Sequence, residues 1–353
     1  MNLADVAAQK DNNWNLIRVV AASSVLVAHS FLLVDGNVFR EPFQRPLSMT
    51  LGDMSVDIFF LASGFLVTKS VVNRPLAQFA LARFLRVWPA LIYAVLAAVL
   101  MGAVVTTEPL ASYFTSPATA QYVAHNLTLF AGTRNALPGV FEHLPLSNFV
   151  NGSLWTLTFE VDMYLLLTLI FALSAAFGPF RQRIRLLIVP ALVCLSFIAA
   201  VTTHAHHHLT RLTIYFFVGS SFYLYRKYIM LDWRAMTFFC VALIAAGLAG
   251  PKAFAIAFPL CVPYALFWVA YVPSGSIRRY NELGDYSYGI YIFAFPVQQL
   301  LVFSFPGIGP FGVMALASAA TLPLAILSWH LVEQRALKFK GIDFAGRFGA
   351  KSA

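Results

Sequence analysis

Long runs of apolar residues, separated by short polar segments, recur along almost the whole chain. At a rise of about 1.5 Å per residue, each run is long enough to cross the roughly 30 Å hydrocarbon core of a bilayer as an α-helix. The pattern therefore predicts an all-α, polytopic helical membrane protein with about ten transmembrane helices. The predicted spans are residues 16–34, 51–72, 84–106, 153–177, 184–203, 209–226, 233–250, 252–272, 285–303 and 307–334.

The segments outside these runs complete a single integral-membrane domain that we expect to occupy residues 1–353. Residues 1–15 form a short polar N-terminal segment, and residues 335–353 form a basic tail. The longest connection, residues 107–152, contains several prolines and is too long for a simple turn, so it could cover a cavity. The sequence shows no internal repeat and no second, soluble domain.

The composition fits a protein that lies almost entirely in a membrane. Hydrophobic residues make up 59% of the chain and charged residues 11%, which excludes an ordinary soluble domain. If the N-terminus is cytoplasmic, 19 of the 24 lysines and arginines fall on the cytoplasmic side. This bias follows the positive-inside rule, so we predict that both termini are cytoplasmic and that the long loop is extracytoplasmic. The net charge of +9 thus reflects topology and not binding to nucleic acid.

The first apolar run carries two ionisable side chains, Arg18 near its start and His29 near its end. Arg18 can extend its guanidinium to the inner interface, whereas His29, about 16 Å further along the helix, cannot. An ionisable group at that depth needs a protein partner or a watery cavity, and it marks a candidate functional site. The alternative is a neutral histidine that is hydrogen-bonded to a neighbouring backbone carbonyl.

A second intramembrane ionisable group lies in the fourth predicted span. Glu160 is about 9 Å inside the outer boundary of that span, where a carboxylate is costly. By the same count, His29 lies in the outer half of its own helix. We therefore predict a hydrogen-bonded pair at matching depths, in which Glu160 orients His29 as a general base. A structural ion pair is the alternative for Glu160.

Two further pairs of like charges each share a helix face. Asp53 and Asp57, one turn apart at the outer end of the second span, could face a cavity or form an interfacial acidic pair. Arg83 and Arg86, three residues apart at the inner end of the third span, present two guanidinium groups side by side. Such a pair suits a phosphate or pyrophosphate ligand, although topology alone also places arginines there.

Three other polar features have weaker implications. Tyr288 and Tyr291 share a helix face that could line the path of a sugar or an acyl group, or could merely pack. Glu333, near the inner end of the last span, is expected to pair with an inner-side arginine. The histidine-rich sequence at residues 204–208 lacks a carboxylate or cysteine partner, so we predict no metal site.

Six segments of the chain form a pattern when taken in order. They are Arg18 with His29 after ten intervening residues, VDIFFLASGFL at 56–66, RFLRVWP at 83–89, LWTLTFEVDMYLL at 154–166, LGDYSYGIYIF at 283–293 and SWHLVE at 328–333. Each segment is a weak signal alone, but six in the right order within a ten-span frame are specific. Together they resemble the acyltransferase-3 family of integral-membrane acyltransferases, whose members O-acylate sugars of surface glycans and related molecules.

The resemblance implies roles for five of these residues. His29 would be the catalytic histidine, Arg18 its companion in the first span, and Glu160 the family's fourth-span glutamate. Arg83 and Arg86 would correspond to the arginine pair that handles acyl-coenzyme A.

Two positions depart from the family pattern. Ala294 stands where the family often has a histidine, and Arg335 stands where a proline usually follows the final glutamate, which could alter how that helix ends.

The predicted reaction moves an acyl group, most simply acetyl, from cytoplasmic acetyl-coenzyme A to a sugar hydroxyl of an exopolysaccharide, a lipopolysaccharide or a related glycan. His29 would act as general base, with a covalent acyl-histidine as the variant mechanism. Acyl-coenzyme A is thus a co-substrate, and no metal is expected. The residues that we expect to bind substrates are Asp53, Asp57, Trp155 and Tyr288.

The expected location is the bacterial inner (cytoplasmic) membrane, as a multi-pass protein surrounded by lipid. Its expected partners are a glycan or lipid-linked sugar acceptor and proteins of glycan biosynthesis, with no nucleic acid. The competing class is a transporter, such as an exporter of a lipid-linked sugar or an acyl group, because ten spans with buried ionisable residues fit that class too. The absence of an inverted repeat disfavours it.

Overall fold

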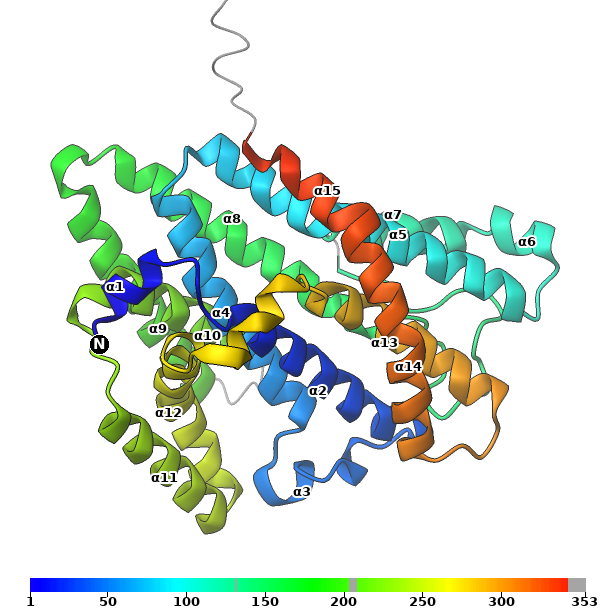
Figure 1. Ribbon diagram of the computed structural model, residues 1–353. Coiled ribbons are helices and arrows are strands. Elements are labelled where there is room, and N and C mark those ends of the chain that lie inside the picture. The colour runs from blue at the N-terminus through cyan, green and yellow to red at the C-terminus, as the bar shows by residue number, and fades with distance from the viewer. Residues whose placement is uncertain (131, 203–207, 342–353) are drawn as a thin grey trace, which may run out of the picture.

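The computed structural model describes residues 1–130, 132–202 and 208–341 (Figure 1). Within these ranges the named secondary structure is entirely helical, which confirms the prediction of an all-α, polytopic membrane protein. Ten long helices of the described chain correspond in order to the ten predicted spans. They are α2 (Trp14–Asp35), α4 (Leu51–Val72), α5 (Leu76–Val105), α8 (Trp155–Ala175), α9 (Arg181–Thr202), α10 (His208–Leu224), α11 (Trp233–Ala249), α12 (Pro251–Tyr271), α13 (Ser287–Ser304) and α14 (Pro310–Ser328).

Short helical segments connect or extend the long helices. Eight segments of the described chain are long and apolar enough to cross a membrane, whereas α10 and α11 have only 17 residues each. The short segments are α1 (Leu3–Ala8), η1 (Val38–Arg40), α3 (Gln44–Leu47), α6 (Leu110–Thr115), α7 (Pro117–Thr128), η2 (Gly152–Leu154), η3 (Gly178–Phe180), η4 (Arg226–Tyr228), η5 (Gly275–Glu282), the π-helical turn η6 (Trp329–Glu333), α15 (Gln334–Leu337) and η7 (Lys338–Gly341).

Two helix boundaries differ from the prediction in ways that affect the site. Helix α5 begins at Leu76 and not at residue 84, because the polar residues of its first two turns are still compatible with a helix that extends beyond the bilayer. Helix α14 does not end near residue 334, since it continues through η6 and α15 to Gly341. With Arg335 in place of a proline, nothing in the sequence stops the helix there.

The helices form a bundle in which neighbours in space are often distant in sequence. Helix α4 packs against α10 and α2, α2 packs against α13, and α13 packs against α14. The hairpin of α11 and α12 lies at one end of the molecule, and α6 lies at the opposite end (Figure 1). Helix α2 begins at the side that the topology prediction makes cytoplasmic, which we call the inner end of the bundle.

The contact between α4 and α10 depends on two glycines. A Cβ atom on Gly64 would lie 1.8 Å from the carbonyl oxygen of Phe216, and one on Gly219 would lie 2.0 Å from the carbonyl oxygen of Leu61. Both distances are far below any real contact, so the two backbones touch directly. Small residues at such a crossing let van der Waals packing hold membrane helices together.

The last part of the long loop folds back against α13. The Asn151 side chain donates to the carbonyl of Ile292 at 2.9 Å, and Gln299 donates to the carbonyls of Leu146 and Phe149 at 3.0 and 2.7 Å. The Gln299 bonds supply partners for two loop carbonyls, and the Asn151 bond ties the loop to α13, which lets irregular backbone lie inside a membrane protein. Asn151 directly precedes η2 and α8, and its partner Ile292 lies only five residues from the inner end of α13. Helix α8 therefore begins deep inside the bundle.

Replacing Gly64 with alanine should destabilise the bundle, because a methyl group there would meet backbone that cannot move aside. We expect a loss of at least the roughly 1–3 kcal/mol typical of overpacking, measured as a lower melting temperature of the purified protein in detergent. Gly309→Ala is the control, since nothing lies within 4 Å of the added carbon. Equal melting temperatures for both variants would contradict the backbone contact.

Candidate active site

A cavity of about 530 Å³ lies among α2, α4, α5, α8 and α13. It follows α4 from Val56 to Ser70, a length of about 21 Å along the helix axis. Basic residues, including Arg74 and Lys340, gather toward its inner end. The predicted site residues in its lining are Arg18, Arg83, Arg86, Glu160 and Tyr288.

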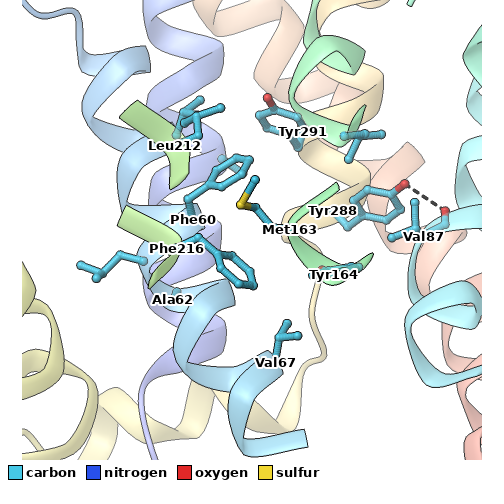
Figure 2. Close-up of a cluster of buried hydrophobic side chains, with 14 of the residues drawn as sticks. Phe60, Ala62, Val67, Val87, Met163, Tyr164, Leu212, Phe216, Tyr288 and Tyr291 are labelled. Carbon is cyan, nitrogen blue, oxygen red and sulfur yellow. Dashed lines mark hydrogen bonds between the residues drawn. The ribbon is translucent and has the colours of Figure 1, made fainter. Parts of the chain in front are cut away.

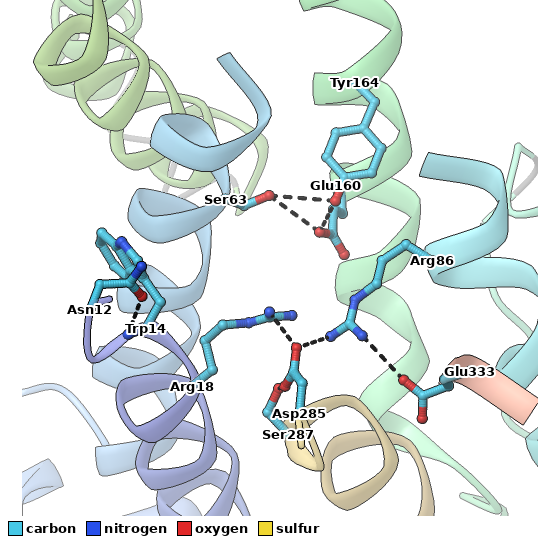
Figure 3. Close-up of polar contacts among 10 residues, drawn as sticks. All are labelled: Asn12, Trp14, Arg18, Ser63, Arg86, Glu160, Tyr164, Asp285, Ser287 and Glu333. Carbon is cyan, nitrogen blue, oxygen red and sulfur yellow. Dashed lines mark hydrogen bonds and ion pairs between the residues drawn. The ribbon is translucent and has the colours of Figure 1, made fainter. Parts of the chain in front are cut away.

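Four charged side chains form a network at the inner side of this cavity (Figure 3). Asp285 accepts from Arg18 at 2.5 Å and from Arg86 at 2.7 Å, and Arg86 also pairs with Glu333 at 3.2 Å. Both carboxylates are nearly inaccessible to solvent. Two positive and two negative charges balance, and the network joins α2, α5, the segment before α13, and η6. The predicted pairing of Glu333 with an inner-side arginine is thereby confirmed.

Local backbone geometry positions the two carboxylates. Gly284 has a φ of +126°, and a Cβ there would lie 2.4 Å from Nε1 of Trp329, so only glycine fits before Asp285. The π-helical turn η6 presents Glu333 to Arg86, and Ser328 donates to the same carboxylate at 3.0 Å. Burial by itself raises the pKa of Asp285, but the adjacent Arg18 and Arg86 lower it by more, so the pKa lies below its usual value.

The two arginines of the third span have different surroundings. Arg86 is held between two carboxylates. In the described part of the chain, no carboxylate pairs with Arg83, whose guanidinium lies 5.8 Å from the centre of the Tyr164 ring and whose Nε has no hydrogen-bond partner. Arg83 shares the inner part of the cavity with Arg74 and Lys340. The cavity therefore offers unpaired positive charge at this end.

Glu160 lies in the cavity wall with two hydroxyl donors (Figure 3). The hydroxyl of Tyr164 donates to its carboxylate, and that of Ser63 donates to the same oxygen at 3.3 Å. The close approach of the two hydroxyls, at 3.5 Å, makes these three residues a compact group between α4 and α8.

The predicted pair of His29 and Glu160 is wrong. The His29 ring packs edge-on against Phe295 at 5.1 Å between centroids, and its Nδ1 has no hydrogen-bond partner in the described chain. Along α4, the two groups lie at different levels. Ala28 lies opposite Gly52, whereas Glu160 bonds to Ser63, eleven residues and about 16 Å further inward.

The cause of this error is the start of α8. Counting from the apparent outer boundary of the span assumes that its first residue lies at the membrane surface. Thr156 instead meets Tyr291, the fifth residue from the inner end of α13, at 2.7 Å between hydroxyl oxygens. Glu160, about one turn further inward, consequently lies well below His29.

Asp53 and Asp57 do not line the cavity, because Arg211 of α10 binds both. Arg211 donates from Nε to Asp57 at 2.8 Å and from a terminal nitrogen to Asp53 at 3.0 Å. Asp53 also completes a capping box with Thr50 at the start of α4. Asp57 is fully buried, whereas Asp53 is one-third exposed and is the carboxylate that acts electrostatically on His29.

Trp155, at the outer end of α8, also lies outside the cavity lining. Its ring is 4.5 Å from the ring of His208, at the start of α10, and 5.7 Å from that of Phe159. The other histidines of the 204–208 sequence lie outside the described residues.

Comparison with known proteins decides the family. A family model described as an acyltransferase domain matches residues 11–330. The chain belongs to this acyltransferase family. This confirms the resemblance to the acyltransferase-3 family, and with it a multi-pass membrane acyltransferase in place of a transporter.

Two relatives match this acyltransferase over almost their full lengths. An "O-acetyl transferase" of Shigella phage Sf6 is 28% identical over 93% of this chain and 96% of its own length. "Nodulation protein 10" of Rhizobium leguminosarum bv. viciae is 28% identical over 93% of this chain and 94% of its own length. No solved structure matches the chain.

Sequence reasoning missed several residues that the fold of this acyltransferase brings into or beside the site. Asp285 is part of the LGDYS sequence, and an acidic residue just before an apolar span could have marked it. Arg211 and Lys340 gave no such signal, because their neighbours in space lie far away in sequence. Ser63 and Tyr164 gave no such signal either, because only their contacts with Glu160 distinguish them from packing residues.

The different surroundings of the two arginines predict different effects of their removal. Arg86→Ala leaves buried Glu333 without its cation, and we expect a loss of roughly 3–5 kcal/mol in unfolding free energy. Arg83→Ala leaves no buried carboxylate unpaired, so its loss should stay within about 1 kcal/mol. Denaturant unfolding in mixed micelles measures both values, and similar losses for the two variants would contradict this division.

Proposed function

We propose that this acyltransferase moves an acyl group, most simply acetyl, from cytoplasmic acyl-coenzyme A to a hydroxyl of a glycan sugar. The observation that carries the proposal is the cavity. Its inner end holds Arg74, Arg83 and Lys340, which have no carboxylate partner among the described residues, and its apolar outer end stops close to the level of His29. This arrangement suits a ligand with phosphates at one end and a small uncharged acyl group at the other.

The inner cations would bind the phosphates of the donor. Arg74, Arg83 and Lys340 supply charge that the protein does not neutralise in its described part, and arginine guanidinium groups bind phosphate well. The pantetheine arm of coenzyme A spans on the order of 17 Å when extended, from ordinary bond lengths. The cavity, about 21 Å long from Ser70 to Val56, can accommodate that arm.

His29 would act as the general base at the outer end. Gly52 of α4 lies opposite Ala28, the residue before His29. Val56, at the outer end of the cavity, is four residues and about 6 Å further along α4. The outer end of the cavity is therefore about 6 Å from the level of Ala28. As the acceptor oxygen attacks the thioester carbon, the imidazole takes its proton and a C–O bond forms. The C–S bond then breaks, and the coenzyme A thiolate leaves and takes up the proton from His29.

The acceptor would approach from the outer side. Near His29, the exposed part of Asp53 offers carboxylate oxygen to sugar hydroxyls. Beside His208, at the start of α10, the partly exposed side chain of Trp155 offers a flat apolar face. The name of the Shigella phage relative, an O-acetyl transferase, supports transfer of an acetyl group to an oxygen atom, and the family resemblance supports a sugar of a surface glycan as acceptor. The origins of these relatives, a Shigella phage and Rhizobium leguminosarum, also support a bacterial inner-membrane location, where proteins of glycan biosynthesis would be partners.

The test uses the purified protein in nanodiscs with acetyl-coenzyme A and a panel of glycan acceptors. We expect acceptor-dependent release of free thiol, and a loss of at least 100-fold in His29→Ala, the range for removing a general base. His143→Ala, at an exposed loop position, is the matched control and should keep the wild-type rate.

Two results would contradict the proposal. Transfer by His29→Ala at nearly the wild-type rate would remove His29 from the chemistry. Acyl transfer that proceeds from a different donor, with no binding of coenzyme A by the wild-type protein, would remove the cavity from donor binding.

A further inference from the structure

The outer end of the cavity contains a pair of hydroxyls that the proposed reaction has not used. Thr156 of α8 and Tyr291 of α13 lie 2.7 Å apart between their oxygens, and both line the cavity. Both residues are buried. They are surrounded there by Val56, Phe59 and other apolar residues, so they are polar groups in mainly apolar surroundings.

The other hydroxyls of the cavity are bound to strong acceptors or lie at the wrong end. Those of Ser63 and Tyr164 donate to Glu160, and that of Ser287 donates to Asp285. Tyr288 donates to the backbone carbonyl of Val87 at 2.9 Å (Figure 2), and Ser70 lies at the inner end. The seven hydroxyl side chains of the lining are Ser63, Ser70, Thr156, Tyr164, Ser287, Tyr288 and Tyr291.

The pair of Thr156 and Tyr291 has one proton more than it needs. Two hydroxyls carry two protons, and the bond between them uses one. Among the described residues, the second proton has no acceptor except the carbonyl of Ser153, which is 3.4 Å from Thr156 and therefore a weak partner. When Thr156 donates to Tyr291, the hydroxyl proton of Tyr291 is free to bind a ligand. A change to this arrangement from the one in which Tyr291 donates to Thr156 loses only the weak bond from Thr156 to Ser153.

The ring of Tyr291 is also held in place. Phe59 packs edge-on against it at 5.7 Å between centroids, and Thr156 fixes its oxygen. A donor that is already oriented loses little entropy when charge develops nearby, which is the requirement for stabilising a transition state. The cations cannot take this role, because Arg18 and Arg86 are bound to Asp285 toward the inner end.

We propose that Tyr291, oriented by Thr156, donates a hydrogen bond to the thioester carbonyl oxygen and stabilises the oxyanion that forms when the acceptor attacks. The proposal rests on the function proposed above. In that step, the carbonyl π electrons move onto oxygen as the C–O bond forms, and they return when the C–S bond breaks. Tyr291 keeps its proton throughout, while His29 handles the proton of the acceptor.

The experiment compares kinetic constants of the wild-type protein and Tyr291→Phe in nanodiscs, with acetyl-coenzyme A and an active acceptor. We expect kcat to fall on the order of 100-fold, as for removal of an oxyanion donor. The donor KM and the Kd for coenzyme A should change less than about threefold, because the bond strengthens only in the transition state. Tyr113→Phe is the control, since it removes a buried tyrosine hydroxyl that lies outside the cavity. The Tyr113 hydroxyl donates to the backbone carbonyl of Val99.

A second pair of variants keeps the test valid if Tyr291→Phe does not fold. Thr156→Val removes the group that orients Tyr291 and should lower kcat by roughly 10-fold, whereas Thr156→Ser keeps the hydroxyl and should restore it.

The proposal is overturned if Tyr291→Phe keeps the wild-type kcat, or if its loss appears as a weaker donor affinity with kcat unchanged. Equal kcat values for Thr156→Val and Thr156→Ser would also overturn it. In these cases the wild-type protein still transfers, so only this inference fails. If the wild-type protein transfers no acyl group from coenzyme A, the proposed function fails, and this inference fails with it.

Discussion

The site depends on the buried charge network of Arg18, Asp285, Arg86 and Glu333. Separating any of these charges from its partners would leave an uncompensated ion among apolar helices, which is far more costly than the pair itself is stabilising. The four residues come from distant parts of the chain, so their pairing fixes α2, α5, α13 and η6 relative to one another at the inner side of the cavity. It also uses up the charge of Arg86, which leaves Arg83 and its basic neighbours for a ligand.

The second constraint is the depth at which α8 begins. The Asn151 side chain donates to the Ile292 carbonyl of α13, and Gln299 donates to the loop carbonyls of Leu146 and Phe149. These bonds let irregular backbone enter the bundle, and Thr156 then meets Tyr291 well below the outer surface. This depth brings Glu160 to Ser63 and Tyr164 in the cavity, and leaves His29 at the outer end with Asp53 as the nearby carboxylate. The polar groups of the molecule are thus separated by depth into an inner set, a cavity set and an outer set.

Much of the fold could be predicted from the sequence, because membrane thickness imposes a minimum length on each apolar run. The ten long helices of the described chain and the pairing of Glu333 followed from local patterns. Relations between helices did not. The position of Arg83 and Arg86 on one helix face was predictable, but their different partners were not, since Asp285 and Glu333 lie about 200 or more residues away. The membrane depth of Glu160, counted from the start of its apolar run, was likewise wrong. The composition of a loop does not show whether the loop enters the bundle or stays outside it.

The central claim is that the donor lies in the cavity with its phosphates at the inner end and its sulfur near Tyr291. The most direct measurement is a cryo-electron microscopy structure in nanodiscs with a thioether analogue of acetyl-coenzyme A, which cannot transfer its acyl group. We expect pyrophosphate density beside Arg83 and Lys340, an intact charge network around Arg86, and the analogue's carbonyl oxygen within hydrogen-bond distance of Tyr291. Phosphate density on Arg86 with its carboxylates displaced, or an analogue bound outside the cavity, would contradict this placement of the donor.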